Sequence, residues 1–299
     1  MNYGICFAGG GIKGAAHIGA IKALEEENLK FDYISGTSSG SIIATLYAAG
    51  YTSDEMLKFF KKYAKKIKYV DPINIFILLI NLFIKRKIVI KGFNNGKIIE
   101  KLLNKELNKK NIKNISDIKK ELLIPSIDIN TGEINVFISK ENRAKYLDNI
   151  IYINNVNIGK AVRASCSYPV VFAPCKINGK QLVDGGLREN VPWKLTKEKG
   201  ADKVLSIIFD EEKNKKNYCK NILEVANNSL GILCHEISNY DLEGADYLLK
   251  IKTEKVQLLD YKKIDELYLK GYEQTKNKIR EIKNNLKINN KKNKLNKNN

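Results

Sequence analysis

Residues 36–40 read Gly36-Thr37-Ser38-Ser39-Gly40, a G-x-S-x-G pattern between a predicted strand at 31–34 and a predicted helix at 41–49. In that position the pattern predicts a nucleophile elbow, a turn tight enough to expose the Ser38 hydroxyl between small neighbours. Ser39 and Gly40 would open the helix, whose dipole favours negative charge near Ser38. The competing interpretation is a serine- and glycine-rich loop that only caps a helix.

A second glycine-rich segment, Gly9-Gly10-Gly11-Ile12-Lys13-Gly14, follows a predicted strand at 3–8 and opens a helix. It matches the dinucleotide-binding pattern G-x-G-x-x-G. That function needs an acid at the end of the second strand, whereas Asp32 stands at its start. The alternative is an oxyanion hole, in which the Gly10 and Gly11 N–H groups face a tetrahedral intermediate and the absent side chains let substrate approach. Lys13 would add positive charge nearby.

An activated serine needs a base, and the chain has two histidines. His17 lies one turn into the helix after the glycine loop, where packing and catalysis are equally compatible with it. His235 lies in the middle of a predicted helix, whereas a Ser-His-Asp triad would need it on a loop. Asp184-Gly185-Gly186 offers another base, because it follows a predicted strand at 180–183. Serine at one strand end and aspartate at another is the arrangement that a Ser–Asp dyad requires.

The segments GGGIKG, GTSSG and DGG, in this order and in these contexts, resemble the three signature motifs of the patatin-like phospholipase family. The similarity extends to RASCSYPVVFAP and DGGLRENVPW on either side of Asn178-Gly179, and it covers roughly residues 3–282. The fold that this resemblance implies is a three-layer α/β/α domain with a mostly parallel central sheet and a nucleophile elbow. Lys13 stands where many members of the family have arginine.

The activity that the resemblance implies is that of a calcium-independent serine lipid acyl hydrolase, similar to phospholipase A, with no cofactor and no metal. Ser38 would be the nucleophile and Asp184 the general base. An ordinary aspartate, with a pKa of about 3.9, is a weak base for a serine hydroxyl, so burial would have to raise its pKa. The family's oxyanion hole corresponds to Gly9, Gly10 and Gly11, and its supporting motif positions to Lys13, Gly14, Gly36, Gly40, Gly185 and Gly186.

Apolar periodicity predicts strands that alternate with helices, which indicates an α/β domain with a mostly parallel sheet. Asn130-Thr131-Gly132 and Asn178-Gly179 predict hairpins. We expect a catalytic core at 3–210, a helix-strand-helix segment at 211–286 that completes the same domain, and a disordered Lys/Asn-rich tail at 287–299. Further helices are predicted at 15–27, 53–66, 97–107, 158–165, 191–199, 219–240 and 264–286, and further strands at 122–129, 133–138, 203–209 and 246–252.

The formal charge of +19 is concentrated in two stretches of the chain. Residues 58–120 hold 18 Lys and Arg against four acids, and residues 276–299 hold nine against one. An anionic partner such as membrane phospholipid would explain this distribution. An AT-rich genome, which enriches Lys, Asn and Ile, would explain it equally well. Specific nucleic-acid binding is not expected, because no motif interleaves aromatic with basic residues.

Residues 73–84, INIFILLINLFI, form the longest apolar run, which is shorter than the roughly 20 residues of a membrane span. Basic residues frame this run, so it could dip into an anionic bilayer; a core helix with a solvated basic end is the alternative. Five cysteines without a CxxC pair and two histidines without metal-ligand spacing argue against a disulfide scaffold and a metal site. With no signal-peptide pattern at the start, we expect a cytoplasmic protein or one peripheral to the membrane.

Two other functions are compatible with the sequence. One is a membrane-binding or signalling module whose dyad no longer turns over, although the intact Ser38, Asp184 and loop glycines argue against it. The other is a dinucleotide-dependent oxidoreductase, which rests on the glycine-rich segment at 9–14 alone. The lipid head group, the acyl position and the oligomeric state have no signal in the sequence.

Overall fold

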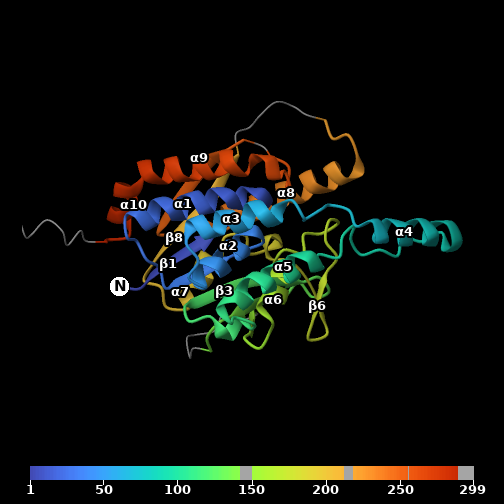
Figure 1. The fold of residues 1–299 in the computed structure, drawn as a ribbon, viewed down its shortest axis with the longest axis horizontal. Coiled ribbons are helices and arrows are strands. Elements are labelled where there is room, and N and C mark those ends of the chain that lie inside the picture. The colour runs from blue at the N-terminus through green and yellow to red at the C-terminus, as the bar shows by residue number, and fades with distance from the viewer. Residues whose placement is uncertain (142–149, 212–217, 255, 289–299) are drawn as a thin grey trace, which may run out of the picture.

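The computed structural model describes residues 1–141, 150–211, 218–254 and 256–288 (Figure 1). Its centre is a nine-stranded mixed sheet in which seven strands follow the order β5-β4-β3-β2-β1-β8-β9, and the β6-β7 hairpin joins at β3. β1, β2, β3, β8 and β9 are parallel neighbours. The strands are β1 (Tyr3–Phe7), β2 (Tyr33–Gly36), β3 (Glu121–Asp128), β4 (Ile134–Ile138), β5 (Ile150–Ile153), β6 (Cys175–Ile177), β7 (Lys180–Asp184), β8 (Lys203–Glu211) and β9 (Tyr247–Thr253).

Helices cover both faces of the sheet. Because side chains of a strand alternate between faces, β1 sends Ile5 and Phe7 into the main core under α1 and α2. Cys6 of the same strand points to the other face, where it packs with Trp193 of α7. This alternation produces the three-layer arrangement that the resemblance implied. The α-helices are α1 (Gly14–Glu26), α2 (Ser39–Ala48), α3 (Ser53–Ala64), α4 (Pro72–Lys85), α5 (Lys97–Leu107), α6 (Ile158–Ser165), α7 (Trp193–Glu198), α8 (Ile222–Asp241), α9 (Ile264–Asn277) and α10 (Ile279–Asn285).

The elements expected from the sequence are present, with three main differences. The helix expected at 264–286 is broken at Lys278 into α9 and α10. The strand expected at 31–34 lies two residues further along the chain, as β2 (Tyr33–Gly36). Strand β5 was not predicted, and it lies beside β4 at the edge of the sheet.

Both predicted hairpins are confirmed. β3 and β4 pair antiparallel across residues 129–133, and β6 and β7 pair across Asn178 and Gly179. Asn178 and Gly179 both have positive φ, of 49° and 78°, as a type I′ turn requires. The C-terminal helix α9 packs along α1 (Figure 1), with ion pairs from Lys276 to Glu26 and Glu27. Most of the predicted disordered tail, at 289–299, lies outside the described residues.

The sheet brings the ends of β2 and β7 together along one edge of β3. β4 occupies the other edge of β3, so the pairing of β2 with Glu121–Leu123 and of β7 with Ser126–Asp128 must use the same edge. β2 is parallel to β3 and β7 is antiparallel to it, so the two strands run toward each other. Their C-terminal ends, Gly36 and Asp184, therefore meet beside the middle of β3.

The apolar run at 73–84 forms most of α4, which projects from the body of the molecule (Figure 1). None of its residues is buried. The alternative in which this run is a core helix is therefore wrong. Among the described residues, no helix combines the length and the apolar character that crossing a bilayer would require.

Candidate active site

Ser38 lies in a sharp turn between β2 and α2, as the G-x-S-x-G pattern predicted. Its backbone has φ 53° and ψ −125°, a conformation typical of the first central position of a type II′ turn and costly for a residue with a side chain. Three contacts maintain this conformation. The Ser38 N–H donates to Ser165 Oγ at 3.0 Å, and Ser41 Oγ donates to the Ser38 carbonyl at 2.6 Å. Gly40 allows close packing, because a Cβ there would lie 2.2 Å from the Phe7 carbonyl oxygen.

Asp184 ends strand β7 and is buried, with 2% of its surface exposed. Its Oδ1 atom accepts a hydrogen bond from the Gly186 N–H at 2.8 Å. Its Oδ2 atom accepts no hydrogen bond of normal geometry within the described parts of the chain. Burial raises the pKa of Asp184 to about 6, and the nearby Ser38 hydroxyl and the Gly186 N–H act in the opposite direction. A buried carboxylate with one free oxygen and a raised pKa is a suitable general base.

The turn after Asp184 packs directly against the elbow. A Cβ on Gly185 would lie 2.5 Å from the Pro125 carbonyl oxygen and 3.0 Å from the Thr37 methyl group. Thr37 Oγ1 donates at 2.5 Å to the Glu189 carbonyl, a few residues beyond this turn. The structure thus packs the turn that follows Asp184 against the turn that contains Ser38.

The glycine loop passes close to Ser38, but its three amides are not equivalent. The Gly9 N–H donates to Asn190, at 3.1 Å to Oδ1 and 3.3 Å to the carbonyl oxygen. The Gly10 and Gly11 N–H groups have no acceptor among the described residues. Gly11 has φ +59° and lines the same pocket as Ser38. Two of the three expected amides are therefore available to an oxyanion.

The remaining predicted supporting residues have structural contacts. Lys13 forms an ion pair with Glu211 at the end of β8 and lies over the Phe209 ring, 5.3 Å from its centroid. Gly14 opens α1 where α3 packs closely against it, since a Cβ there would lie 3.3 Å from the Phe60 ring, closer than an ordinary van der Waals contact. Lys13 is thus engaged with the end of the sheet.

Neither histidine is placed to act as a base for Ser38. His17 is fully buried under the glycine loop, where Nε2 hydrogen-bonds the Ala8 carbonyl oxygen at 2.9 Å. Burial lowers the pKa of His17 to about 4, so this ring is neutral near neutral pH and Nε2 donates to the carbonyl. His235 is exposed on α8, where Nδ1 lies 3.1 Å from Asn239 Nδ2. The packing interpretation of His17 is the one that the structure supports.

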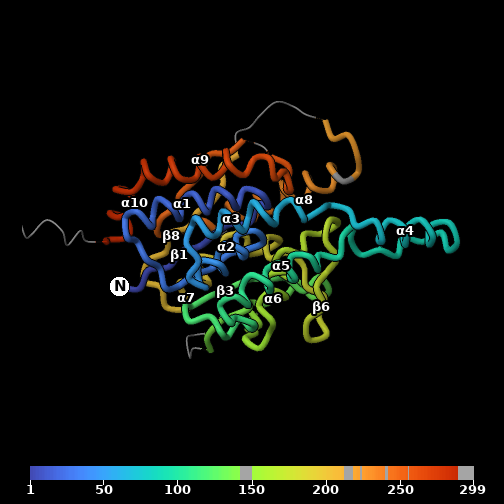
Figure 2. The backbone as a smooth tube through the Cα atoms, viewed as in Figure 1, coloured from blue at the N-terminus to red at the C-terminus, as the bar shows by residue number. Residues whose placement is uncertain are grey.

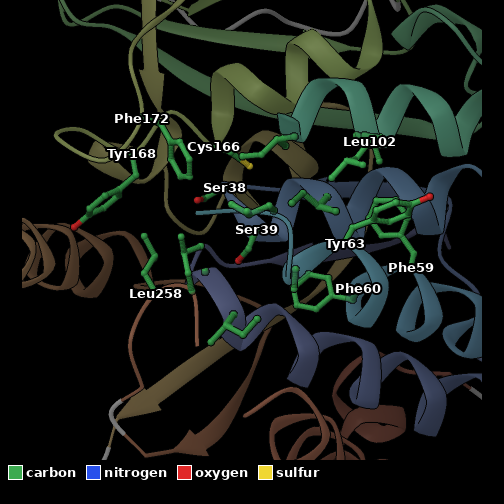
Figure 3. Close-up of a pocket in the computed structure, with 18 residues that line it drawn as sticks. Ser38, Ser39, Phe59, Phe60, Tyr63, Leu102, Cys166, Tyr168, Phe172 and Leu258 are labelled. Atoms are coloured by element: carbon green, nitrogen blue, oxygen red, sulfur yellow. The ribbon is translucent and has the colours of Figure 1, made fainter. Parts of the chain in front are cut away.

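An apolar pocket opens beside Ser38 (Figure 3). In the figure, Ser38 and Cys166 lie close together, Tyr168 and Leu258 lie toward one side, and Phe59, Tyr63 and Leu102 toward the other. Phe59, Phe60 and Tyr63 of α3 and Ile99, Leu102 and Leu103 of α5 form part of the wall of this pocket. Its lining residues include Ile42, Phe59, Phe60, Tyr63, Ile67, Ile99, Leu102, Leu103, Cys166, Tyr168, Phe172 and Leu258. An apolar pocket of this kind accepts a hydrocarbon chain rather than a sugar or a nucleotide.

Two residues of the site were missed by the sequence analysis. Ser165 fixes the backbone of the elbow from the end of α6. Asn190 joins the glycine loop to α8, because its Nδ2 donates to Ser238 Oγ at 3.2 Å while its Oδ1 accepts from Gly9. The contact of Ser165 with Ser38 and that of Asn190 with Gly9 each join residues more than 120 positions apart, so no local pattern could have indicated them.

The dinucleotide-binding alternative lacks its acidic residue. Asp32 precedes β2, and its N–H donates to the carbonyl of Tyr3, at the start of β1. Asp32 therefore lies at the N-terminal end of β1, whereas the glycine loop follows the C-terminal end of that strand. Asp32 forms an ion pair with Lys120. Clusters of three or more His, Cys, Asp or Glu side chains suited to a metal ion are absent from the described residues.

Comparison of the sequence with known families and proteins identifies relatives over most of the chain. The model of the patatin-like phospholipase family matches residues 5–197. The uncharacterized protein YqhO of Bacillus subtilis is 33% identical over 220 residues, which are 71% of this chain and 73% of YqhO. Lysophospholipase NTE1 of Meyerozyma guilliermondii is 25% identical over 204 residues, which are 68% of this chain and 12% of that protein.

Solved structures with a similar arrangement are more distant in sequence. The chain is similar to VipD from Legionella pneumophila, with a TM-score of 0.49 and 15% identity, over 94% of this chain and 67% of VipD. It is also similar to human GIVD cytosolic phospholipase A2 bound to methyl gamma-linolenyl fluorophosphonate. That TM-score is 0.49 with 12% identity, over 96% of this chain and 59% of that one.

Proposed function

This chain belongs to the patatin-like phospholipase family and is therefore a carboxylic ester hydrolase that acts on lipids. On that premise, we propose that it cleaves phospholipid acyl esters with a Ser38–Asp184 dyad. The observation that carries this proposal is the buried carboxylate of Asp184, which has one free oxygen and lies next to the elbow that exposes Ser38. The apolar pocket beside Ser38 supports an acyl chain as the group that is bound.

In the proposed first step, Asp184 Oδ2 takes the proton of the Ser38 hydroxyl as Ser38 Oγ attacks the ester carbonyl carbon. The carbonyl oxygen becomes an oxyanion, which the Gly10 and Gly11 N–H groups would stabilise. We assign the Gly9 amide a different role, because it is already bonded to Asn190 and so holds the loop in position. The intermediate then collapses, and the alcohol leaves with the proton from Asp184.

The second step reverses these roles with water. Asp184 takes a proton from a water molecule, the resulting hydroxide attacks the acyl-Ser38 ester, and a second oxyanion forms in the same hole. Collapse releases the fatty acid and returns the proton to Ser38 Oγ. Because one carboxyl group serves as base and then as acid in each half-reaction, a pKa of about 6 is better suited than the ordinary value near 4.

Mass spectrometry of fatty acids and lysolipids, after incubation of the protein with mixed bacterial phospholipids, tests this proposal. We expect fatty-acid release by the parent protein and none by Ser38→Ala, with the same rate in calcium and in EGTA. A fluorophosphonate probe should label the parent on the Ser38 peptide and leave Ser38→Ala unlabelled. A folded parent that released no fatty acid and took up no probe would overturn the dyad and leave a lipid-binding module.

A further inference from the structure

α4 is an apolar helix that no other part of the described chain covers. Five of its apolar side chains are more than half exposed, and Phe83 reaches 92%. The only polar residues between positions 73 and 84 are Asn74 and Asn81, which lie seven positions apart. All of the remaining positions hold apolar side chains. A helix that is apolar all round normally lies in a core or in lipid. The five residues are Ile73, Phe76, Leu79, Phe83 and Ile84.

The two asparagines do not prevent α4 from entering an apolar medium. Asn74 Nδ2 donates to the Gly92 carbonyl at 3.2 Å, and Asn81 Nδ2 donates to the Ile77 carbonyl one turn back at 2.9 Å. Their amide groups thus have internal partners, which lowers the cost of removing them from water. The start of the helix is capped in the same way, because Asp71 Oδ1 accepts from the Ile73 N–H at 3.0 Å.

The base of α4 is attached to the segment that borders the pocket. The Asp71 N–H donates to the Phe93 carbonyl, and the Phe93 N–H donates to the Val170 carbonyl. Val170 lies between Tyr168 and Phe172, which both line the pocket beside Ser38. Figure 2 shows the chain leaving the body along α4 and returning along residues 86–92.

α8 flanks the same border. Tyr168 Oη donates to the Asn227 carbonyl of α8 at 3.4 Å. α8 exposes further apolar side chains, among them Ile232 and Leu233, and it lies at the same end of the molecule as α4 (Figure 1). The apolar surface is therefore gathered around the pocket that would receive the acyl chain.

The charges near α4 favour an anionic surface. Between residues 67 and 97 there are six basic residues and one acid. Three of the basic residues, Lys85, Arg86 and Lys87, are consecutive and exposed at the far end of the helix. At 14 residues the helix is about 21 Å long, shorter than the roughly 30 Å of a bilayer core. It fits an element that lies within one leaflet while long basic side chains reach the head groups.

We propose that α4 is a membrane anchor that inserts into the surface of an anionic phospholipid bilayer and holds the mouth of the acyl pocket against it. This inference rests on the proposed function, because it gives the lipid acyl hydrolase a way to take substrate directly from a membrane. An anionic bilayer fits α4 better than a protein partner does, because the apolar helix ends in exposed cations.

Vesicle binding tests the anchor without relying on catalysis. In Ser38→Ala protein, which would leave the lipids intact, we expect cosedimentation with phosphatidylcholine vesicles that contain 30% phosphatidylglycerol. Adding Phe76→Ser and Leu79→Ser should weaken this binding at least tenfold. These side chains are 64% and 58% exposed, so the two changes should leave the fold intact. In protein that keeps Ser38, they should also leave the hydrolysis of a soluble short-chain ester unchanged.

A matched control tests whether vesicle binding depends on apolar side chains of α4 or on exposed apolar surface anywhere on the protein. Ile129 and Leu269 are 52% and 53% exposed and lie away from α4, after β3 and in α9. Ile129→Ser with Leu269→Ser should leave vesicle binding at the level of the parent. Equal weakening by both pairs would overturn the anchor, because any exposed apolar surface would then suffice.

The charge component has its own pair of variants. Lys85→Gln, Arg86→Gln and Lys87→Gln together should lower affinity for the anionic vesicles on the order of 100-fold, and added salt should lower the affinity of the parent. Replacing the exposed Lys30, Lys140 and Lys176 with glutamine removes the same number of positive charges. It should lower the affinity for the anionic vesicles much less. Equal effects of the two triple variants would overturn the assignment of this attraction to α4.

Depth of insertion gives the decisive readout. A tryptophan introduced as Phe76→Trp should be quenched by lipids brominated on their acyl chains, whereas the buried Trp193 should not. Absence of quenching, or a Phe76→Ser/Leu79→Ser variant that changes from dimer to monomer with unaltered vesicle binding, would show that another protein surface covers α4. Fatty-acid release by a protein that failed these tests would leave the proposed hydrolase intact.

Discussion

The backbone N–H of Ser38 donates to the hydroxyl of Ser165 at 3.0 Å, which ties the elbow after β2 to the end of α6. Ser165 is fully buried, and its hydroxyl oxygen accepts the hydrogen bond that water would otherwise accept from the Ser38 N–H. The strained φ of 53° at Ser38 is therefore supported by a residue 127 positions away. This contact makes α6 part of the support of the proposed active site.

Replacing Ser165 with alanine should destabilise the protein by about 1–3 kcal/mol, because a buried N–H loses its acceptor. The elbow should also become less well held, and kcat for a soluble ester should fall more than KM changes. Thermal unfolding and steady-state kinetics measure the two effects. As a control, Ser206→Ala removes a buried hydroxyl from β8, where its neighbour is the Cys6 thiol rather than the elbow, and it should retain both properties. Equal loss in the two variants would contradict this role of Ser165.

Ser38→Ala and Asp184→Asn should each reduce ester hydrolysis by at least about 10⁴-fold while the protein stays folded. Because both residues act in one step, the double variant should be no slower than the slower single variant. Circular dichroism and initial rates provide the comparison. His17→Gln and His235→Gln should retain most of the activity; loss of activity in His235→Gln comparable with that in Ser38→Ala would replace the dyad with a triad.

The rate should depend on pH through Asp184. Burial raises the pKa of this carboxyl to about 6, and only the deprotonated form can accept the Ser38 proton. We expect kcat/KM for a soluble ester to fall about tenfold per pH unit below pH 6 and to level off above it. The same limb should persist in His17→Gln, since the pKa of His17 is about 4. A limb that disappeared in His17→Gln would assign the titration to that histidine.

The same carboxyl should make the folded protein less stable as pH rises. The folded state holds the Asp184 proton more tightly than the unfolded state, so the free energy of unfolding falls between about pH 4 and pH 6 and stays lowered above that range. Asp184→Asn removes this cost, on the order of 3 kcal/mol for two pKa units. We expect its melting temperature to exceed that of the parent at pH 7.5, with the difference vanishing near pH 4.

The comparison with the parent is needed because His17 acts in the opposite direction. Its pKa is lowered from 6.5 to about 4 by burial, so it contributes stability above pH 6.5 that is lost as pH falls toward 4. His17 is unchanged in Asp184→Asn, and its contribution cancels in the difference. A parent more stable than Asp184→Asn at pH 7.5 would contradict the destabilising burial of the carboxylate charge.

Asn190 should act as a positioning residue. Asn190→Ala removes the acceptor at 3.1 Å from the Gly9 N–H and frees the loop that carries the Gly10 and Gly11 amides. We expect kcat to fall about 10- to 100-fold with a smaller change in KM. Asn190→Asp keeps an acceptor but adds a negative charge near Asp184, so it should move the acid limb of the rate profile to higher pH. An unmoved limb with a normal rate in both variants would show that Asn190 has no such role.

The local elements of this fold could be predicted because each depends on neighbouring residues. The type I′ turn at Asn178-Gly179, the turn at Ser38 and the strand before Asp184 have signals within a few positions, since backbone conformation and apolar periodicity are local properties. The three motifs likewise indicated the family, and the dyad followed from that resemblance together with the placement of Ser38 and Asp184 at strand ends. Boundaries were less certain, as the break at Lys278 and the start of β2 at Tyr33 show.

Tertiary structure decided what depends on pairing between distant segments. Only the shared edge of β3 brings the end of β7 to the end of β2, and only burial raises the pKa of Asp184. Asn190 and Ser165 become part of the site through contacts that cross most of the chain. The apolar run of α4 has the sequence of a core helix, and its exposure follows from the absence of any packed surface against it in the described structure. Apolar periodicity records which side chains avoid water, but only the packed chain determines whether protein covers them.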